Sequence, residues 1–293
     1  MKSVLVMMST YNGAKYLREQ LDSLLCQENV EVYIYIRDDG SSDNTVDIIK
    51  EYSEKNSCID FEVGENLGYA KSFWTLFTHE NKYDYYAFAD QDDVWHNDKL
   101  YKAVEFMEKG QTDVPLLYTS DVISVNDSGE TLNKHTFGVK ESINFYQSLQ
   151  KSILPGCTFV FNNSAFSIIQ KFNGYMESHD WAVYCIVSAF GKVLFDQVSH
   201  INYRIHESNA IGKSSTMQEL LVRAKRFFAK SKCVRSKFSK DFYDCYKEDL
   251  TNASYKNSVY NLGYYKENRK KELFFDKNFK GIIFKIYVIL NRV

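Results

Sequence analysis

The sequence predicts an α/β fold, with a mostly parallel central sheet covered by helices on both faces and a C-terminal helical extension. In the first half of the chain, short apolar runs alternate with segments in which apolar residues recur at helical spacing. The connections are short and rich in Asn, Asp, Gly and Ser, which favours a parallel sheet built from strand–helix units. After Gly212 the pattern becomes helical, basic and aromatic, so we expect one domain over residues 1–212 and an extension over 213–293.

Each expected element rests on a local pattern. Strands are predicted where turn residues bound an apolar run, at residues 4–8, 30–36, 59–63, 85–89, 116–119, 122–125, 157–161, 193–195 and 201–205. Helices are predicted where apolar residues form one face, at residues 17–25, 46–52, 70–77, 100–107, 165–172 and 179–190. Ser42 or Asp43 is expected to cap the second of these helices.

The two expected parts differ in charge, although the whole chain carries only −2. Residues 1–212 contain 17 Lys and Arg against 30 Asp and Glu, a net of −13, and residues 213–293 contain 19 against 8, a net of +11. Basic residues among aromatic and aliphatic ones, at 217–240 and 279–293, are typical of a helix on an anionic membrane surface. A helical subdomain with a solvated basic face is the alternative. Nucleic acid is not an expected partner, because the acidic body would repel it.

The cysteines and the N-terminal segment indicate a compartment. Six cysteines lie far apart without a Cys-x-x-Cys pair, which favours reduced thiols in a reducing environment. The first apolar run ends at Ser9, too early for a signal peptide, and no stretch approaches the roughly 18 apolar residues of a membrane span. We therefore expect a cytoplasmic protein that is peripheral on the inner face of the cell membrane.

Three of the first four predicted strands end in polar loops, which a parallel sheet would bring to one edge. These loops are Ser9-Thr10-Tyr11-Asn12, Asp38-Asp39-Gly40-Ser41 and Asp90-Gln91-Asp92-Asp93. One such loop is readily explained as a turn, but three on neighbouring strands favour a ligand site. The carboxylates at 90–93 repel one another unless a cation compensates them, and a divalent ion shared with substrate phosphates does so. The chain has no Gly-x-x-x-x-Gly-Lys or Gly-x-Gly-x-x-Gly segment, which argues against P-loop and dinucleotide chemistry.

The same loops, in order and spacing, resemble family 2 glycosyltransferases of the GT-A fold over residues 1 to about 212. The segments that carry the resemblance are Ser9-Thr10-Tyr11-Asn12-Gly13, residues 37–43, Asn66-Leu67-Gly68 and residues 88–95. Asp-Gln-Asp-Asp-x-Trp is similar to a subgroup identified as bacterial rhamnosyltransferases and other polysaccharide-building enzymes. The resemblance implies a nucleotide-diphosphate sugar donor, such as dTDP-rhamnose or a UDP-hexose, and Mn²⁺ or Mg²⁺ as the cofactor.

The resemblance also implies which residues contact the donor. They are Thr10, Tyr11, Asp38, Asp39, Lys71, Asp90, Gln91 and Arg204. Thr10 and Tyr11 would hold the base and ribose, and Asp38 or Asp39 would accept a hydrogen bond from a base N–H group. Asp90 would face the ribose, and Arg204 would lie near the diphosphate. Lys71 is equally consistent with a solvated helix lysine.

Metal and catalytic roles follow from the same resemblance. Asp92 would bind the metal that bridges the diphosphate, and His206, in a segment similar to the family's Tyr-Arg-x-His-x-x-Asn-x-x-Gly, would be a further ligand. Asp180 stands at a helix start where the family has an acidic catalytic base; a helix cap is the alternative. The acceptor-side candidates are Trp95, Gly156, His179 and Trp181, and a plain turn explains Gly156 equally well.

Together these residues imply an inverting glycosyltransferase. Asp180 would take the proton from an acceptor hydroxyl as that oxygen attacks the anomeric carbon in a single displacement. The acceptor would be a glycan or a lipid-diphosphate-linked sugar in cell-surface polysaccharide synthesis. The alternative is a catalytically inactive protein that binds nucleotide sugars with the same fold. A nucleotidylyltransferase is disfavoured, because residues 9–13 lack the Gly-rich loop and lysine of those enzymes.

Overall fold

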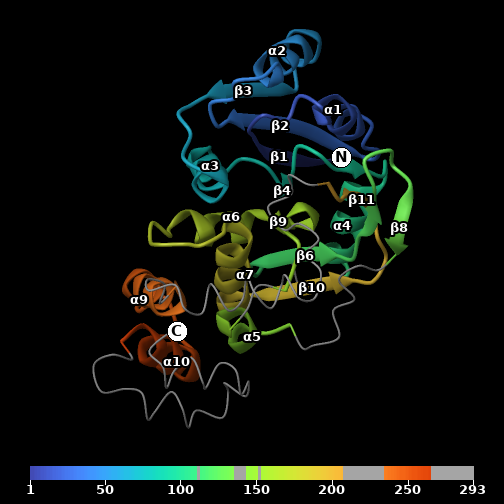
Figure 1. Ribbon diagram of the computed structural model, residues 1–293. Helices are drawn as coiled ribbons and strands as arrows, with labels where there is room; N and C mark the ends of the chain where they lie inside the picture. Colours follow the sequence, from blue (N-terminus) through green and yellow to red (C-terminus); the bar gives the residue numbers. More distant parts are fainter. Residues whose placement is uncertain (111–112, 135–142, 151–152, 207–233, 265–293) are drawn as a thin grey trace. The chain divides into compact units, whose positions relative to one another are not determined.

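The computed structural model describes residues 1–110, 113–134, 143–150, 153–206 and 234–264 (Figure 1). The chain divides into two compact units. The first comprises residues 1–141, 152–170 and 178–204, and the second comprises residues 142–151, 171–177 and 205–293. The predicted domain boundary at residue 212 lies outside the described residues and stays a prediction.

A seven-stranded sheet forms the centre of the first unit. In spatial order its strands are β10 (Lys192–Asp196), β6 (Leu116–Ser120), β9 (Val160–Asn162), β4 (Tyr85–Ala89), β1 (Lys2–Thr10), β2 (Val30–Asp38) and β3 (Ile59–Val63). Strand β1 pairs in parallel with β2 and β4, β2 with β3, and β10 with β6. Strand β9 lies antiparallel between β4 and β6. The predicted mostly parallel sheet is confirmed.

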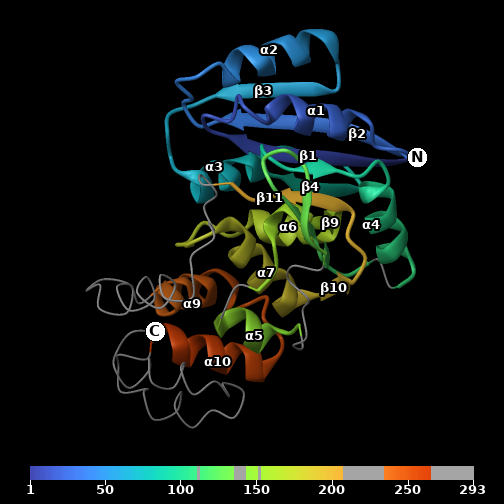
Figure 2. The same ribbon diagram turned by 45° about the vertical axis from the view of Figure 1, so that its right-hand side comes forward.

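Helices cover both faces of this sheet, as predicted (Figures 1 and 2). They are α1 (Leu17–Leu25), α2 (Thr45–Lys55), α3 (Tyr69–Thr75), α4 (Lys99–Glu108), α6 (Asn163–Gln170) and α7 (His179–Phe190), with 3₁₀ turns at η1 (Leu76–Thr78) and η2 (Gly156–Thr158). Along β4, Ala87 and Ala89 join the core cluster that contains the apolar residues of α1, α2 and α4. Phe88 packs instead against Phe73 of α3, with ring centroids 5.4 Å apart. Since neighbouring residues of a strand face opposite sides, β4 is buried on both, which explains its uninterrupted apolar run.

A smaller sheet follows the Asp90–Asp93 loop along the chain. Its strands, in spatial order, are β5 (Val94–Trp95), β11 (Ile201–Arg204), β7 (Ile123–Val125) and β8 (Thr131–Lys134). Strand β5 is antiparallel to β11, with Trp95 opposite Ile201. The chain that leaves the acidic loop is therefore fixed to the strand that carries Arg204.

The structure differs from two local predictions. Residues 157–161 do not form one strand, because the Thr158 N–H and hydroxyl groups both donate to the Pro155 carbonyl and make the 3₁₀ turn η2; β9 begins only at Val160. The N-cap of α2 is Asn44 rather than Ser42 or Asp43, although Asp43 does accept the Thr45 N–H group at 3.0 Å.

The second unit contains helices α5 (Phe145–Gln150), α9 (Val234–Tyr246) and α10 (Ala253–Gly263) in its described part. Aromatic packing joins them: the Phe145 ring lies 5.9 Å from that of Phe242 and 4.6 Å from that of Tyr255. Among the described residues, no helix has the length and apolar character needed to cross a bilayer. Most of the predicted interfacial segment 217–240, and all of 279–293, lie outside the described residues.

Candidate active site

The three polar loops meet at the carboxyl edge of β4, β1 and β2, which are neighbours in the sheet. The Asp39 N–H group donates to the Thr10 carbonyl at 2.8 Å. On the other side, the Gln91 side chain accepts the Tyr11 N–H group at 2.9 Å and donates to the Tyr11 carbonyl at 3.1 Å. The convergence predicted from the sequence is therefore confirmed, and hydrogen bonds connect each loop to the next.

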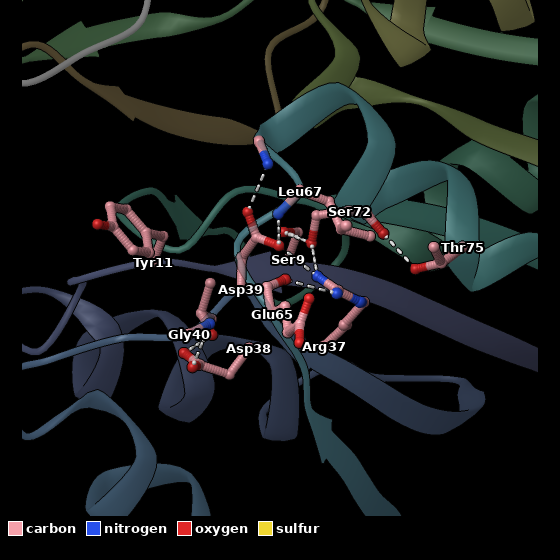
Figure 3. A network of polar contacts seen from close by, with 12 residues as sticks. Ser9, Tyr11, Arg37, Asp38, Asp39, Gly40, Glu65, Leu67, Ser72 and Thr75 are labelled. Carbon is pink, nitrogen blue, oxygen red and sulfur yellow. Dashed lines mark hydrogen bonds and ion pairs between the residues drawn. The ribbon is translucent and has the colours of Figure 1, made fainter.

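The Gln91 amide depends on the glycine at position 13. A Cβ atom there would lie 2.2 Å from Gln91 Oε1, closer than any real contact. Glycine therefore lets Gln91 lie against the β1 loop and hold the Tyr11 backbone. Tyr11 is 48% exposed at this edge of the sheet, and its ring points away from the neighbouring network (Figure 3).

Asp38 is completely buried and organises its own loop. Its Oδ1 atom accepts the Thr10 and Ser41 hydroxyls at 2.8 and 2.6 Å. Its Oδ2 atom accepts the backbone N–H groups of Gly40 and Ser41 at 3.1 and 2.8 Å. Gly40 has a φ of +80°, a conformation that glycine adopts without strain. The Asp38 carboxylate thus has four protein donors.

Asp39 connects β2 to the loop before α3, as Figure 3 shows. It forms an ion pair with the buried Arg37 guanidinium at 2.5 Å and accepts the N–H groups of Leu67 and Gly68, both at 2.9 Å. Arg37 also donates to the Ser72 hydroxyl at 2.8 Å. Because Asp38 and Asp39 both have protein partners, their predicted bond to a nucleotide base stays a prediction.

The Asp90–Asp93 loop has a different electrostatic character. Asp90 is half-buried, and burial together with the charges of Asp92 and Asp180 raises its pKa to about 7. Asp93 is fully buried, and burial and its carboxylate neighbours raise its pKa as well. Asp93 Oδ1 accepts the Arg204 N–H group at 3.0 Å, whereas Oδ2 has no hydrogen-bond partner. Since such shifts need short distances, Asp90, Asp92 and Asp180 lie in one region of the molecule.

These carboxylates fit a divalent cation. Ligand atoms of Asp90, Asp93 and Cys157 lie within 4.8 Å of one another. A cation would offset the repulsion that favours protonation of Asp90, and carboxylate oxygens are the ligands that Mg²⁺ and similar ions prefer. Cys157 and Asp93 are buried, so they lie behind the half-buried Asp90 and Asp92. His206 belongs to the second unit, and its predicted role as a ligand stays a prediction.

Asp180 lies in the first turn of α7, after the N-cap residue Ser178. It is half-buried, and its Oδ1 atom accepts the Trp181 N–H group at 2.7 Å. Gly156 of η2 lets this helix start approach closely, because a Cβ atom at 156 would lie 2.9 Å from the Asp180 Cβ atom. Gly156 is thus a close-packing position beside the predicted catalytic base.

His179, which was predicted for the acceptor side, is a buried side chain. It stacks on Phe73, with centroids 3.9 Å apart, and only 6% of its surface is exposed. Its Nδ1 atom has no hydrogen-bond partner, and burial lowers its pKa to about 4. Proton transfer to or from an imidazole needs an accessible nitrogen, which the burial of His179 disfavours. The predicted place of His179 on the acceptor side stays a prediction.

The two tryptophans predicted for the acceptor side are buried. Trp95 is 2% exposed and Trp181 is 5% exposed, which leaves them almost no surface for an acceptor. Their predicted contact with the acceptor stays a prediction. Trp95 packs under the Lys99 ammonium, whose nitrogen lies 3.4 Å from the ring centroid.

The two basic residues predicted to contact the sugar donor, Lys71 and Arg204, differ in burial. Lys71 is exposed on α3. Arg204 is 2% exposed, and its guanidinium donates to the carbonyls of Asp92 and Asp127 at 2.9 and 2.8 Å and to Glu19 Oε2 at 2.5 Å. Arg204 therefore fixes the backbone of Asp92, and its predicted contact with the diphosphate stays a prediction.

Two supporting residues were given no role from the sequence: Arg37 and Lys99. Arg37 had a signal, since an arginine inside a strand with buried neighbours needs a partner. Lys99 had none, because a lysine in the first turn of a helix is ordinarily solvated. It is in fact 1% exposed, and burial lowers its pKa to about 7.

Comparison with known proteins identifies the family. Residues 5–169 match the family described as Glycosyl transferase family 2. The chain belongs to this family. It is 31% identical over 218 residues to the dTDP-rhamnosyl transferase RfbG of Shigella flexneri, covering 70% of this chain and 73% of that protein. It is 30% identical to the uncharacterized glycosyltransferase alr2836 of Nostoc sp., covering 70% of this chain and 65% of that protein.

Solved structures agree on the fold. S. aureus TarS 1–349, in complex with UDP-GlcNAc, superposes with a TM-score of 0.58 at 15% identity, over 100% of this chain and 88% of that chain. The mannosyltransferase PcManGT of Pyrobaculum calidifontis, in complex with GDP-Man and Mn²⁺, gives a TM-score of 0.52 at 12% identity, over 98% and 78% of the two chains. The predicted GT-A fold is confirmed.

Proposed function

We propose that this glycosyltransferase is a metal-dependent, inverting enzyme that uses a nucleotide-diphosphate sugar, either dTDP-rhamnose or a UDP-hexose. The proposal is carried by the convergence of Asp92 and Asp180 on Asp90, the residue that follows β4, whose carboxyl group both charges affect. Similarity to a dTDP-rhamnosyl transferase supports the first donor, and similarity to a protein solved with UDP-GlcNAc supports the second.

The β1 loop and Gln91 are the proposed nucleotide contacts. Tyr11 offers an exposed ring, and its backbone is held in place by the Gln91 amide. Asp92 and Asp90 would hold Mn²⁺ or Mg²⁺. When bound, the ion offsets the negative charge of the diphosphate and makes the nucleoside diphosphate a better leaving group. Arg204 holds the carbonyl of Asp92 and so fixes the direction of the loop.

The transfer step needs a base beside the anomeric carbon. In the proposed reaction, the Asp180 carboxylate accepts the acceptor's hydroxyl proton, that oxygen bonds to the anomeric carbon, and the bond to the diphosphate oxygen breaks. One displacement inverts the anomeric configuration. His179 stays neutral and buried, so it leaves Asp180 as the base at this helix start.

The proposed acceptor is a hydroxyl of a glycan or lipid-diphosphate-linked sugar in cell-surface polysaccharide synthesis. A protein working on such an acceptor needs access to the cytoplasmic membrane surface, and the +11 charge of residues 213–293 suits anionic lipid. Co-sedimentation with anionic and neutral vesicles tests this part, and equal negligible binding to both contradicts it.

The Asp180→Asn variant tests the proposed chemistry. We expect turnover to fall about 10²- to 10⁴-fold, the range for loss of a general base, while donor affinity changes only a few-fold. Single-turnover transfer and calorimetric donor binding measure the two quantities separately. Asp47→Asn is the matched control, because Asp47 is an exposed acidic residue in the first turn of α2. Comparable turnover in Asp180→Asn would place the base elsewhere, and absence of transfer by the wild type with retained donor binding would favour the inactive binding protein.

A further inference from the structure

A second group of potential metal ligands lies where the smaller sheet begins. His96 follows β5, His200 precedes β11, and Asp98 is the residue before α4. One ligand atom from each side chain lies within 4.8 Å of the others. His200 is 7% exposed, and the other two are half-buried. None of the three is used by the proposed sugar transfer.

Backbone contacts arrange this group before any ion binds. The β5–β11 pairing continues beyond the strands, with the His96 N–H group donating to the His200 carbonyl at 3.0 Å. The turn after His96 is closed by the Lys99 N–H group, which donates to the His96 carbonyl at 3.1 Å. The Gln27 amide donates to the same carbonyl at 2.8 Å. The two imidazoles and the carboxylate are therefore presented on a fixed frame.

The Asp98 side chain does not cap helix α4. Asp98 occupies the N-cap of α4, where an aspartate ordinarily accepts a helix N–H group, yet its side chain makes no capping hydrogen bond. Its Oδ1 atom lies 3.0 Å from His200 Nδ1 instead. Two ligand atoms that share one Zn²⁺ ion, each about 2.0–2.2 Å from it, lie about 3.3–3.6 Å apart in tetrahedral geometry. An ion would therefore replace the hydrogen bond of this pair and move its two atoms apart by a few tenths of an ångström.

Outer contacts orient both imidazoles for binding. His96 Nε2 lies 3.1 Å from Asn202 Oδ1. This oxygen can accept a hydrogen bond only from a protonated Nε2, and in that tautomer Nδ1 keeps its lone pair. His200 Nε2 faces Asp196 Oδ2 at 4.0 Å, and the Tyr118 hydroxyl holds that carboxylate at 3.1 Å. Ligand histidines in metal sites ordinarily have such partners on the second ring nitrogen.

We propose that His96, Asp98 and His200 bind a transition-metal ion of the Zn²⁺ type, separate from the ion of the donor site. Two imidazoles and one carboxylate suit Zn²⁺ or Co²⁺, whereas the acidic loop offers the carboxylates that suit Mg²⁺ or Mn²⁺. His200 precedes Arg204 by four residues, about 13 Å of extended strand. The ion links the end of β5 to the start of β11 and so stabilises the pairing of these strands. Asp93 directly precedes β5, and Arg204 is the last residue of β11.

Cobalt and zinc titrations without nucleotide test this site. We expect Co²⁺ to give a visible d–d absorption band that saturates at one ion per chain, and Zn²⁺ to raise the thermal unfolding midpoint. Asp98→Asn and His96→Gln should each weaken Co²⁺ binding at least about 10-fold. Asp92→Asn should bind Co²⁺ at this site as the wild type does, which separates it from the proposed donor metal.

Three outcomes would overturn the inference. In the first, the wild type gives no band and no zinc-dependent rise in the midpoint, so that Asp98 and His200 form only a hydrogen bond. In the second, Asp98→Asn and His96→Gln bind as the wild type does. In the third, Asp92→Asn removes the band, which assigns it to the acidic loop. Circular dichroism of each variant confirms folding, and His96 is half-buried, so its glutamine variant keeps the test usable if Asp98→Asn does not fold.

Discussion

Two pairs of adjacent aspartates follow neighbouring parts of the same sheet, and the protein treats them in opposite ways. Asp38 and Asp39 lie at the end of β2, and each of their carboxylate oxygens accepts at least one hydrogen bond from the protein. Asp92 and Asp93, after β4, lie among other carboxylates, and Asp93 Oδ2 has no hydrogen-bond partner. The first pair is held by protein donors, and the second has the crowding expected of a site that receives a cation.

The buried cations beside the two pairs differ in the same way. Arg37 pairs with Asp39 at 2.5 Å and donates to Ser72. Lys99 is near Asp93, but its nitrogen makes no hydrogen bond and packs on the Trp95 ring. The two pairs look alike in the sequence, and they differ in the hydrogen-bond partners that the fold gives them. That difference supports the proposed metal site at the second pair.

The largest expected effect comes from Arg37→Met. It removes the partner of a buried carboxylate, which costs about 3–5 kcal/mol of unfolding free energy when a buried ion pair is broken. Urea denaturation at neutral pH measures the loss. A change below about 1 kcal/mol would mean that the backbone donors of Leu67 and Gly68 alone satisfy Asp39, and the contrast between the two pairs would weaken.

The next effect is the dependence of stability on acidic pH, because burial disfavours the protonated form of His179. Its pKa falls from the usual 6.5 to about 4 on folding, so the unfolded chain binds the proton first as pH decreases. This histidine's contribution to stability is complete above pH 6.5 and is lost as pH falls toward 4, by about 1.4 kcal/mol per pH unit and about 3 kcal/mol in all. His179→Gln should therefore show a flatter decline than the wild type in urea midpoints between pH 7 and pH 4.5. Parallel declines would show that His179 is protonated in the folded protein.

The smallest effect is expected for Lys99→Met, the counterpart of Arg37→Met. A buried ammonium without a hydrogen bond is replaced by an apolar side chain of similar length, an exchange that is often neutral or stabilising. We expect the unfolding free energy at pH 7 to stay within about 1 kcal/mol of the wild type or to rise. Denaturation of both methionine variants under identical conditions gives the comparison; a loss as large as that of Arg37→Met would assign Lys99 a stabilising ion pair.

Much of the fold was predictable because its signals are local. The runs at 4–8 and 85–89 read as buried parallel strands, and β1 and β4 include them. The antiparallel β9, only three residues long, depends on the strands on either side of it and has no periodicity of its own. A turn that bonds to Pro155 replaced the start of the predicted strand. Tertiary contacts decide such short elements.

The same distinction between local signals and tertiary contacts applies to the candidate site. The acidic loop, the loops after β1 and β2 and the helix start at Asp180 were visible as motifs, and folding brings the loops together. The burial of Trp95, Trp181 and Lys99 was not visible, because an aromatic or basic residue near a motif reads the same whether it faces ligand or core. The two uses of an Asp-Asp pair were also hidden, since the deciding partners, Arg37 and Leu67, come from other parts of the chain.

Calorimetric titration of the donor with and without Mn²⁺ tests the central claim most directly, that the acidic loop binds the nucleotide sugar through a cation. For the wild type, we expect donor binding with Mn²⁺ and a loss of at least about 10-fold in affinity with EDTA, because carboxylates and diphosphate then repel each other. Asp92→Asn should bind the donor weakly under both conditions, while the exposed Asp47→Asn control keeps the metal response. Equal donor affinity with and without Mn²⁺ in the wild type, unchanged in Asp92→Asn, would contradict the account.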